Sequence, residues 1–176
     1  MRIISGSCGG RTINPPKNLR ARPTTDFAKE NLFNVLGNMV DLDGLEVLDL
    51  FAGTGSISYE FASRGAASVT SVEINAVHFN FIKSTAKSFN LTAIHPVKAN
   101  VFLYLKSCTK QYDVIFSDAP YDLEESEQVV DMVFENNLLR EGGIFIFEHS
   151  KSQDFSSHPR FSKLKSYGSV QFSIFE

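Results

Sequence analysis

Hydrophobic and polar positions follow two different periods along most of the chain. Short apolar runs, typical of buried strands, alternate with longer stretches in which apolar residues recur every three or four positions, as in amphipathic helices. The runs predict strands at 46–50, 68–74, 93–97, 112–117 and 144–147, and two more around Gly168 within 161–175. The stretches predict a first helix that stops near Gly37 and others at 56–63, 76–90, 101–107 and 125–139. Strands that alternate with helices favour a mostly parallel α/β sheet with helices on both faces.

Both ends of the chain depart from this alternation. The last two strands have no helix between them, so we expect seven strands with an antiparallel strand at one edge. Near the start, the β-like pieces 2–4 and 11–13 flank a glycine-rich turn and predict a small β-hairpin. We therefore divide the chain into an N-terminal arm with this hairpin, residues 1–25, and a main domain, residues 26–176.

Charge sets this arm apart from the main domain. The net charge is -3, yet residues 1–25 hold five basic residues and no acidic one. The other 151 residues hold 12 basic against 20 acidic residues. A basic arm on an acidic body favours contact with a polyanion as strongly as it favours a solvated N-terminus.

Several protein classes are excluded by simpler features. No apolar run approaches the roughly 18 residues of a membrane span, and the first residues lack the apolar stretch of a secretory signal. Only Cys8 and Cys108 are present, without CxxC spacing, which argues against a disulfide framework and a zinc site. We expect a soluble cytoplasmic protein that holds no metal.

Ligands of a parallel sheet bind outside the carboxyl ends of its strands. The first such end is Asp49-Leu50-Phe51-Ala52-Gly53-Thr54-Gly55, where the glycines let a ligand approach the backbone at the start of a helix. The second is Glu73, a carboxylate that can accept hydrogen bonds from both hydroxyls of a ribose. Together, the glycine loop and Glu73 favour a site for a nucleoside cofactor. The alternative is a structural turn at the glycines and a surface glutamate at position 73. Asn100, after the third strand, suits an adenine edge and a helix cap equally well.

The fourth strand end carries the most specific chemistry, in Ser117-Asp118-Ala119-Pro120-Tyr121. The lone pair of an exocyclic amine on a nucleobase is delocalised into the ring, which makes the amine a poor nucleophile. A carboxylate and a backbone carbonyl that accept its two N–H bonds would localise that lone pair. An aromatic ring such as Tyr121 could stack on a base held outside its helix.

With these residues the sequence resembles the class I methyltransferases that use S-adenosylmethionine, and more closely the RsmD family, which methylates guanine N2 in 16S ribosomal RNA. The resemblance runs over nearly the whole chain. It rests on Met1 to Gly6, Gly10-Arg11, Arg22-Pro23-Thr24, Glu30 to Leu36, Leu48 to Gly55, Ser63 to Val69, Asp118 to Tyr121 and Glu148-His149. Ala119 stands where the family usually has a proline, and Asn100 where an aspartate is common.

The resemblance implies a Rossmann-like class I fold and a role for each matching position. S-adenosyl-L-methionine would be held by Asp49, Phe51, Gly53, Gly55, Glu73, Ile74, Asn100, Val101 and Asp118. Asp118, Pro120 and Tyr121 would form the catalytic group, and Arg2, Arg11, Arg20, Arg22 and Tyr121 would contact RNA. The implied partner is the small ribosomal subunit or its RNA, and the protein is expected to be a monomer.

Two other interpretations stay open. The first is an adenine-N6 DNA methyltransferase or a glutamine-N5 protein methyltransferase, although these typically carry Asn in the motif and a DNA enzyme usually adds a recognition domain. The second is a non-catalytic RNA-binding protein that retains a cofactor fold. His149 ends a strand at the active side and is a weaker candidate for substrate contact. The aromatic set Phe27, Phe33, Phe79, Phe81, Phe89, Phe145 and Phe147 is assigned to the core rather than to base stacking.

Overall fold

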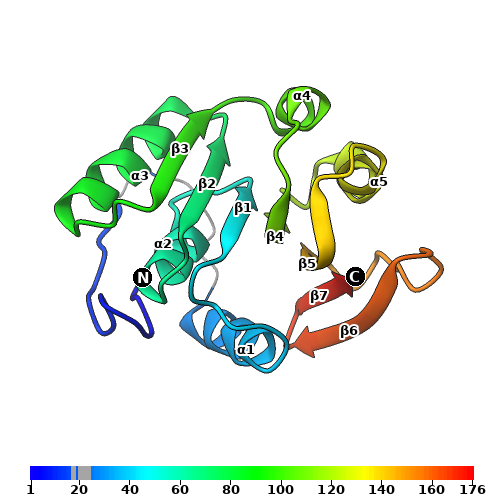
Figure 1. The fold of residues 1–176 in the computed structure, drawn as a ribbon, viewed down its shortest axis with the longest axis horizontal. Helices are drawn as coiled ribbons and strands as arrows, with labels where there is room; N and C mark the ends of the chain where they lie inside the picture. Colours follow the sequence, from blue (N-terminus) through cyan, green and yellow to red (C-terminus); the bar gives the residue numbers. More distant parts are fainter. Residues whose placement is uncertain (17–18, 20–24) are drawn as a thin grey trace.

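The computed structural model describes residues 1–16, 19 and 25–176, which form one sheet flanked by helices (Figure 1). The strands are β1 (Glu46–Leu50), β2 (Ser68–Glu73), β3 (Ile94–Lys98), β4 (Tyr112–Asp118), β5 (Leu139–His149), β6 (Phe161–Tyr167) and β7 (Val170–Phe175). The helices are α1 (Asp26–Gly37), α2 (Ser56–Ser63), α3 (Ala76–Ser88), α4 (Val101–Ser107) and α5 (Gln128–Glu135), with a 3-10 turn, η1 (Glu124–Glu127). In this part of the chain no helix is long and apolar enough to cross a membrane.

The sheet has the strand order β3-β2-β1-β4-β5-β7-β6. Neighbouring strands from β3 to β5 pair in parallel, whereas β7 runs antiparallel to both β5 and β6. The predicted antiparallel strand therefore lies at this end of the sheet, and the predicted α/β class with seven strands is confirmed.

Alternation along each strand builds two cores, one on each face of the sheet. Val47 belongs to the core under α1, α2 and α3, whereas Leu48 and Leu50 belong to the core under α4 and α5. Figure 1 shows α2 and α3 on one side of the strands and α4 and α5 on the other. The strands thus read as nearly continuous apolar runs because both of their faces are buried.

The predicted boundaries fail between 125 and 147. The helix predicted for 125–139 is the 3-10 turn η1 followed by α5, which is capped at Asn136 and stopped by Asn137 in the left-handed conformation (φ 52°). The strand predicted for 144–147 extends over all of β5 and contains the glycine pair rather than following it. Gly143 permits this because a Cβ there would lie 2.9 Å from the carbonyl oxygens of Arg140 and Asp113.

The two pieces of the predicted N-terminal hairpin pair through an antiparallel bridge between Arg2 and Thr12, flanked by hydrogen bonds from Ile3 N–H to Arg11 O (3.0 Å) and from Ile13 N–H to Met1 O (2.9 Å). Its turn places Gly6 at φ 83°, where a Cβ would lie 1.8 Å from the carbonyl oxygen of Ser63 at the end of α2. Ile3 and Ile13 are buried in the same core as α1 and α2. The described residues before Asn14 are therefore packed onto the main domain rather than extended from it.

A fully buried carboxylate, Glu60 on α2, holds this packing together. Its Oε2 accepts a hydrogen bond from the backbone N–H of Ile4 (2.8 Å), and its Oε1 accepts from Ser5 N–H (3.0 Å). Arg64 Nε also donates to Oε1 (2.8 Å), and Lys29 Nζ of α1 lies 3.6 Å from Oε2. One side chain thus joins the N-terminal segment, α1 and α2.

Lys29 completes the cluster from α1. Its ammonium donates to the carbonyl oxygen of Arg2 (2.5 Å) and to Ser56 Oγ (3.2 Å) at the start of α2. Burial lowers the pKa of Lys29, and the nearby Glu60 carboxylate opposes that shift. The charged form of Lys29 is therefore favoured mainly by Glu60 and also by Asp26.

We expect Glu60→Ala to lower the free energy of unfolding by about 3–5 kcal/mol, because it leaves a buried ammonium without its partner. Urea denaturation measures the loss. Glu30→Ala is the matched control, since Glu30 is exposed on α1 next to Lys29, and it should stay within about 0.5 kcal/mol. Adding Lys29→Met to Glu60→Ala should restore part of the loss. If Glu60→Ala proves as stable as Glu30→Ala, the cluster does not hold the N-terminal segment in place.

Candidate active site

A cavity of about 710 Å³ opens where β1, β2, β4 and β5 end. It is lined by the residues that follow those strands, by the start of α1 and by the turn between β6 and β7. Six of the predicted cofactor residues line it, namely Asp49, Phe51, Gly53, Glu73, Ile74 and Asp118. This is the edge at which open α/β sheets bind ligands.

The loop from β1 to α2 forms one wall of the cavity. Phe51 has φ 58°, an uncommon conformation that costs a non-glycine residue about 1–3 kcal/mol. Gly53 and Gly55 also have positive φ, and a Cβ on Gly55 would lie 2.8 Å from the ring of Tyr59. The loop therefore packs tightly against α2, with Gly55 as a buried support rather than a lining residue.

Glu73, at the end of β2, holds this loop in place. Its Oε2 accepts from the backbone N–H of Gly53 (2.8 Å), and its Oε1 accepts from Asn75 N–H (2.7 Å). His78 Nδ1 lies 3.9 Å from Oε2. A carboxylate oxygen has a second lone pair, so the predicted contact with ribose hydroxyls is compatible with these bonds.

Asp49 is the most deeply buried acid of the cavity. Ser58 donates its hydroxyl to Asp49 Oδ2 (2.5 Å), and the hydroxyls of Ser58 and Ser71 are 2.6 Å apart. Burial raises the pKa of Asp49 to about 7, with smaller contributions from the Asp118 and Glu73 carboxylates, while the Ser58 hydrogen bonds lower it. Ser58 occupies the position where a dinucleotide-binding loop has its third glycine, and here it serves as a hydrogen-bond donor to Asp49.

The Asp118 segment lies beside this loop because β4 pairs with β1. Pro120 and the half-exposed Tyr121 line the cavity together with Ala119, which is buried. The turn is closed by a hydrogen bond from Leu123 N–H to the Pro120 carbonyl (3.0 Å). The structure thus brings the three predicted catalytic residues together with the glycine loop.

Asn100 and Val101 are not among the lining residues of this cavity. Asn100 is the N-cap of α4, and its Oδ1 accepts from Leu103 N–H (3.2 Å). Val101 is buried in the core beneath α4. Of the two interpretations open for Asn100, the structure shows the helix cap, and its contact with adenine stays a prediction.

Two of the arginines proposed for RNA contact, Arg2 and Arg11, are not among the lining residues of the cavity. Arg2 is half-exposed, with Nε 3.9 Å from Asp26 Oδ2. The Arg11 guanidinium lies 5.2 Å from the centre of the Phe89 ring. Arg20 and Arg22 are outside the described residues. His149, the weaker candidate, is buried, with Nε2 2.8 Å from Ser173 Oγ.

The sequence prediction places Phe27 in the core, and this prediction is wrong. It is 67% exposed in the first turn of α1 and lines the cavity, with its ring 6.5 Å from that of Tyr167. In Figure 1 the arrowhead of β6, which ends at Tyr167, points toward α1. The buried stripe of α1 contains positions 28, 29, 32, 33 and 36, so helical periodicity along α1 could have placed Phe27 outside it.

Glu148 also lines the cavity, and the sequence prediction assigns it no role. Its side chain is 5% exposed at the end of β5. At the end of β5 the sequence prediction names His149 as a weaker candidate for substrate contact and includes Glu148 only among the residues of the family resemblance. A charged residue that ends an apolar strand was the available signal.

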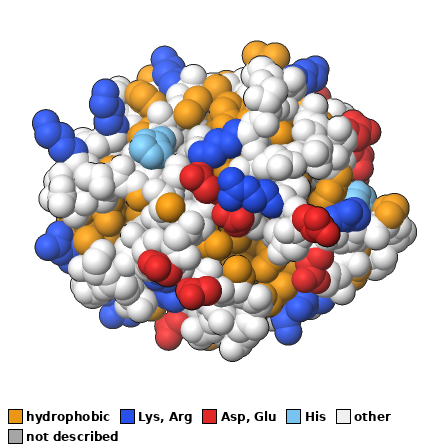
Figure 2. All heavy atoms as spheres, in the orientation of Figure 1, with side chains coloured by type: hydrophobic (Ala, Val, Ile, Leu, Met, Phe, Trp, Pro, Cys, Tyr) orange, Lys and Arg blue, Asp and Glu red, His pale blue; other side chains and the backbone are white. Residues whose placement is uncertain are grey.

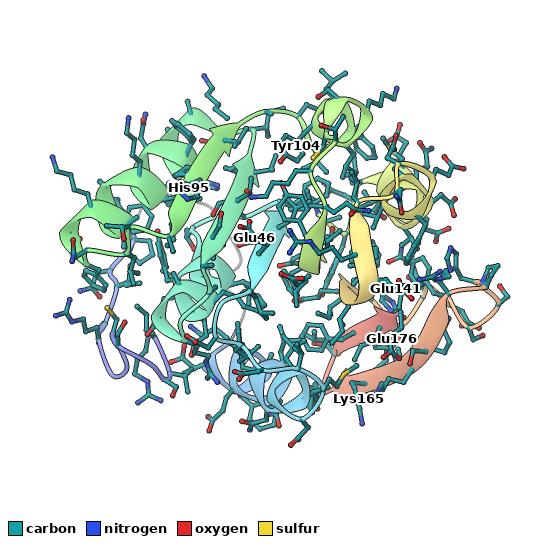
Figure 3. All side chains as sticks on the ribbon, in the orientation of Figure 1. Glu46, His95, Tyr104, Glu141, Lys165 and Glu176 are labelled. Atoms are coloured by element: carbon teal, nitrogen blue, oxygen red, sulfur yellow. The ribbon has the colours of Figure 1, made fainter. Side chains whose placement is uncertain are left out.

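The cavity lining carries charge of one sign. Asp49, Glu73, Asp118, Asp122 and Glu148 are acidic, and no Lys or Arg is among the described lining residues. Elsewhere the signs are mixed: Figure 2 shows acidic and basic side chains side by side in the middle of one face. Glu46, labelled in Figure 3, lies on that face and pairs with Lys110 (2.5 Å). An acidic cavity favours a ligand that carries positive charge.

Comparison with known proteins identifies the family of this chain. The family described as Conserved hypothetical protein 95 matches residues 1–176. A Haemophilus influenzae protein named Ribosomal RNA small subunit methyltransferase D is 30% identical over 182 residues, covering 100% of this chain and 93% of that protein. The chain is a member of the RsmD family.

A second relative and a solved structure are similar to this chain over most of its length. The Bacillus subtilis protein named Putative rRNA methyltransferase YlbH is 34% identical over 155 residues, covering 86% of this chain and 83% of its own. The solved structure of the putative methyltransferase yhhF from Escherichia coli has a TM-score of 0.87 at 25% identity, covering 99% of this chain and 96% of that one. The Rossmann-like class I fold predicted for this RsmD family member is confirmed.

The raised pKa of Asp49 predicts a pH dependence of stability. Because the folded protein holds this proton more tightly than the unfolded chain, the stability that Asp49 contributes is lost as pH rises toward about 7. Asp49→Asn removes the titration and keeps an acceptor for Ser58. Between about pH 5 and about pH 8 the variant should gain about 2–3 kcal/mol on the wild type in the free energy of unfolding, at about 1.4 kcal/mol per pKa unit. Parallel stability curves for the two proteins would disprove the shift.

Proposed function

We propose that this RsmD family member transfers a methyl group from S-adenosylmethionine to the exocyclic N2 amine of a guanine in 16S ribosomal RNA. The observation that carries the proposal is the position of Asp118. It ends the strand next to β1 and lines the same cavity as the glycine loop. The name of the Haemophilus influenzae relative, a small-subunit ribosomal RNA methyltransferase, supports the choice of substrate.

The residues of the cavity fit S-adenosylmethionine. The bound cofactor supplies a methyl group activated by a positively charged sulfonium, and it also carries an ammonium group. The acidic lining suits these charges, and Gly53, held by Glu73, leaves the loop open to a ligand. Asp49 and the glycine loop would hold the methionine end, and Glu73 and Ile74 the ribose side.

The residues after β4 would act on the substrate amine. Asp118 and a backbone carbonyl of the turn would accept its two N–H bonds and localise the nitrogen lone pair. Tyr121 would stack on the base, and Pro120 would fix the turn that presents both groups. Catalysis is then mainly positioning of the amine against an already activated methyl group.

The RNA would approach over the N-terminal segment. Arg2 and Arg11 of the described residues, with Arg20 and Arg22, supply the positive charge that the main domain lacks. We further propose a cytoplasmic monomer in which residues 1–25 serve RNA contact and residues 26–176 serve methyl transfer. Its partner would be the small ribosomal subunit or its RNA.

The deciding experiment compares small-subunit RNA from cells with and without the gene. Nuclease digestion and mass spectrometry should show one N2-methylguanosine missing in the deletion strain and restored by the gene. Loss of an N6-methyladenosine instead would favour an adenine-N6 enzyme. No change in RNA together with no binding of S-adenosylmethionine in calorimetry would favour a non-catalytic RNA-binding protein.

Asp118→Ala should lower kcat by roughly 10²–10³-fold, as for the loss of one hydrogen-bonding group at a reacting atom. The affinity for S-adenosylmethionine should stay nearly unchanged, because the carboxylate acts on the substrate. Asp118→Asn keeps an acceptor oxygen and should retain part of the activity. Asp122→Ala, in the same loop, is the matched control for charge. Full activity in Asp118→Ala would remove Asp118 from the mechanism.

Arg11→Glu should weaken RNA binding and flatten its dependence on salt. Each lost phosphate contact reduces the log–log slope by roughly 0.7–0.9, which filter binding at several salt concentrations measures. Lys83→Glu makes the same charge change on the exposed side of α3 and should leave the slope almost unaltered. Equal slopes for all three proteins would show that Arg11 does not meet RNA phosphates.

A further inference from the structure

Two acidic side chains stand in register at the substrate side of the cavity. Asp118 of β4 pairs with Glu148 of β5, the last pair in the register of these parallel strands. Asp118 follows Phe116 by two residues, and Glu148 follows Ile146 by two. Phe116 and Ile146 face the same core, so alternation directs both carboxylates to the same face of the sheet. Both residues line the cavity.

The end of β5 is held firmly. On its far side Glu148 pairs with Phe172 of β7, which is fully buried and contacts the rings of Phe116 and Tyr167. The next residue, His149, is fixed by hydrogen bonds at both ring nitrogens, to Ser150 O and Ser173 Oγ (2.8 Å each). The Glu148 carboxylate therefore reaches the cavity from a rigid and largely apolar floor.

Strand order divides the cavity into two halves. Glu73 and the glycine loop belong to β2 and β1, whereas Glu148 belongs to β5, three strands from β2. At about 4.8 Å per strand, Glu148 lies roughly 14 Å from the ribose side and one strand beyond Asp118. A cofactor held by β2 and β1 with its methyl group directed at Asp118 leaves the half at β5 to the substrate.

The substrate half also contains aromatic rings. Phe27 and Tyr167 line the cavity at the side of α1 and β6, and Tyr121 lines it after β4. Such rings hold a planar nucleobase and leave its edge to meet polar groups. The polar groups available to that edge include two adjacent carboxylates.

Guanine carries two adjacent hydrogen-bond donors on its Watson–Crick edge, the N2 amine and the N1–H group. We propose that Glu148 is a specificity-determining residue that accepts the N1–H of the target guanine while Asp118 accepts from N2. The order of the strands fixes this assignment. The N2 amine must face the cofactor, so the N1–H group is the neighbouring donor on the side away from the cofactor. The inference rests on the proposed function, since it assumes a guanine in this half of the cavity.

The arrangement would exclude adenine and its relatives. Adenine and 2,6-diaminopurine have an unprotonated N1 that accepts hydrogen bonds, so a carboxylate opposite N1 meets a lone pair. A site built for a particular hydrogen bond rejects ligands that cannot complete it far more strongly than an apolar pocket would. 2,6-Diaminopurine is the sharper probe, because it keeps the 2-amino group and alters the group at N1.

The test uses small-subunit RNA, free or assembled into subunits, whichever form the wild-type protein methylates. The mapped target position carries guanosine in one preparation and 2,6-diaminopurine riboside in the other. Wild type and Glu148→Gln are compared by kcat/KM for methyl transfer, and by RNA affinity in the absence of cofactor. Glutamine is nearly isosteric and can donate its amide N–H to an unprotonated N1. Asp122→Asn removes the same charge from the same cavity and serves as the control.

Glu148→Gln should lose roughly tenfold in kcat/KM on guanosine and gain on 2,6-diaminopurine, so that the preference between them falls by roughly 10². RNA affinity should shift in the same direction, and Asp122→Asn should keep the wild-type preference. An unchanged preference in Glu148→Gln, or the same change in both variants, overturns the role of Glu148. A wild-type protein that methylates neither RNA overturns the proposed function instead.

Discussion

The buried carboxylate of Glu60 is the interaction on which the geometry of the cavity depends. It fixes the N-terminal segment through Ile4 and Ser5, and it balances the charge of Lys29 from α1. Lys29 in turn donates to Ser56, the first residue of α2 after the glycine loop. One charge cluster thus sets the position of α1, which carries Phe27, and the end of the glycine loop that lines the cavity.

The cavity itself is costly to the fold. It contains a buried Asp49 whose pKa is about 7, a left-handed Phe51 and four further acidic residues, while no Lys or Arg is among the described lining residues. Natural proteins tolerate such features where function needs them. A cationic ligand bound here would neutralise part of this charge and stabilise the folded state by mass action.

Much of the fold and part of the site follow from the sequence, because they depend on local pattern. Apolar runs located all seven strands, and the ends of β1, β2 and β4 identified Asp49, Glu73 and Asp118. The exposure of Phe27 could have been found only by testing each aromatic residue against its own helix. The position of Glu148 beside Asp118 depends on the pairing of β4 with β5. The burial of Glu60 depends on contacts with residues 55 and 56 positions away. Such long-range pairings leave little local signal.

Because β7 lies between β5 and β6, the sheet depends on the last strand of the chain. β5 and β6 have no direct pairing, so they become neighbours only when β7 inserts and bonds to both. Until then β5 presents a long apolar edge, of the kind that promotes aggregation. Phe172, which lies in register beside Glu148, arrives with the same strand. The pairing that covers the edge of β5 is therefore the same pairing that completes the cavity wall around Glu148.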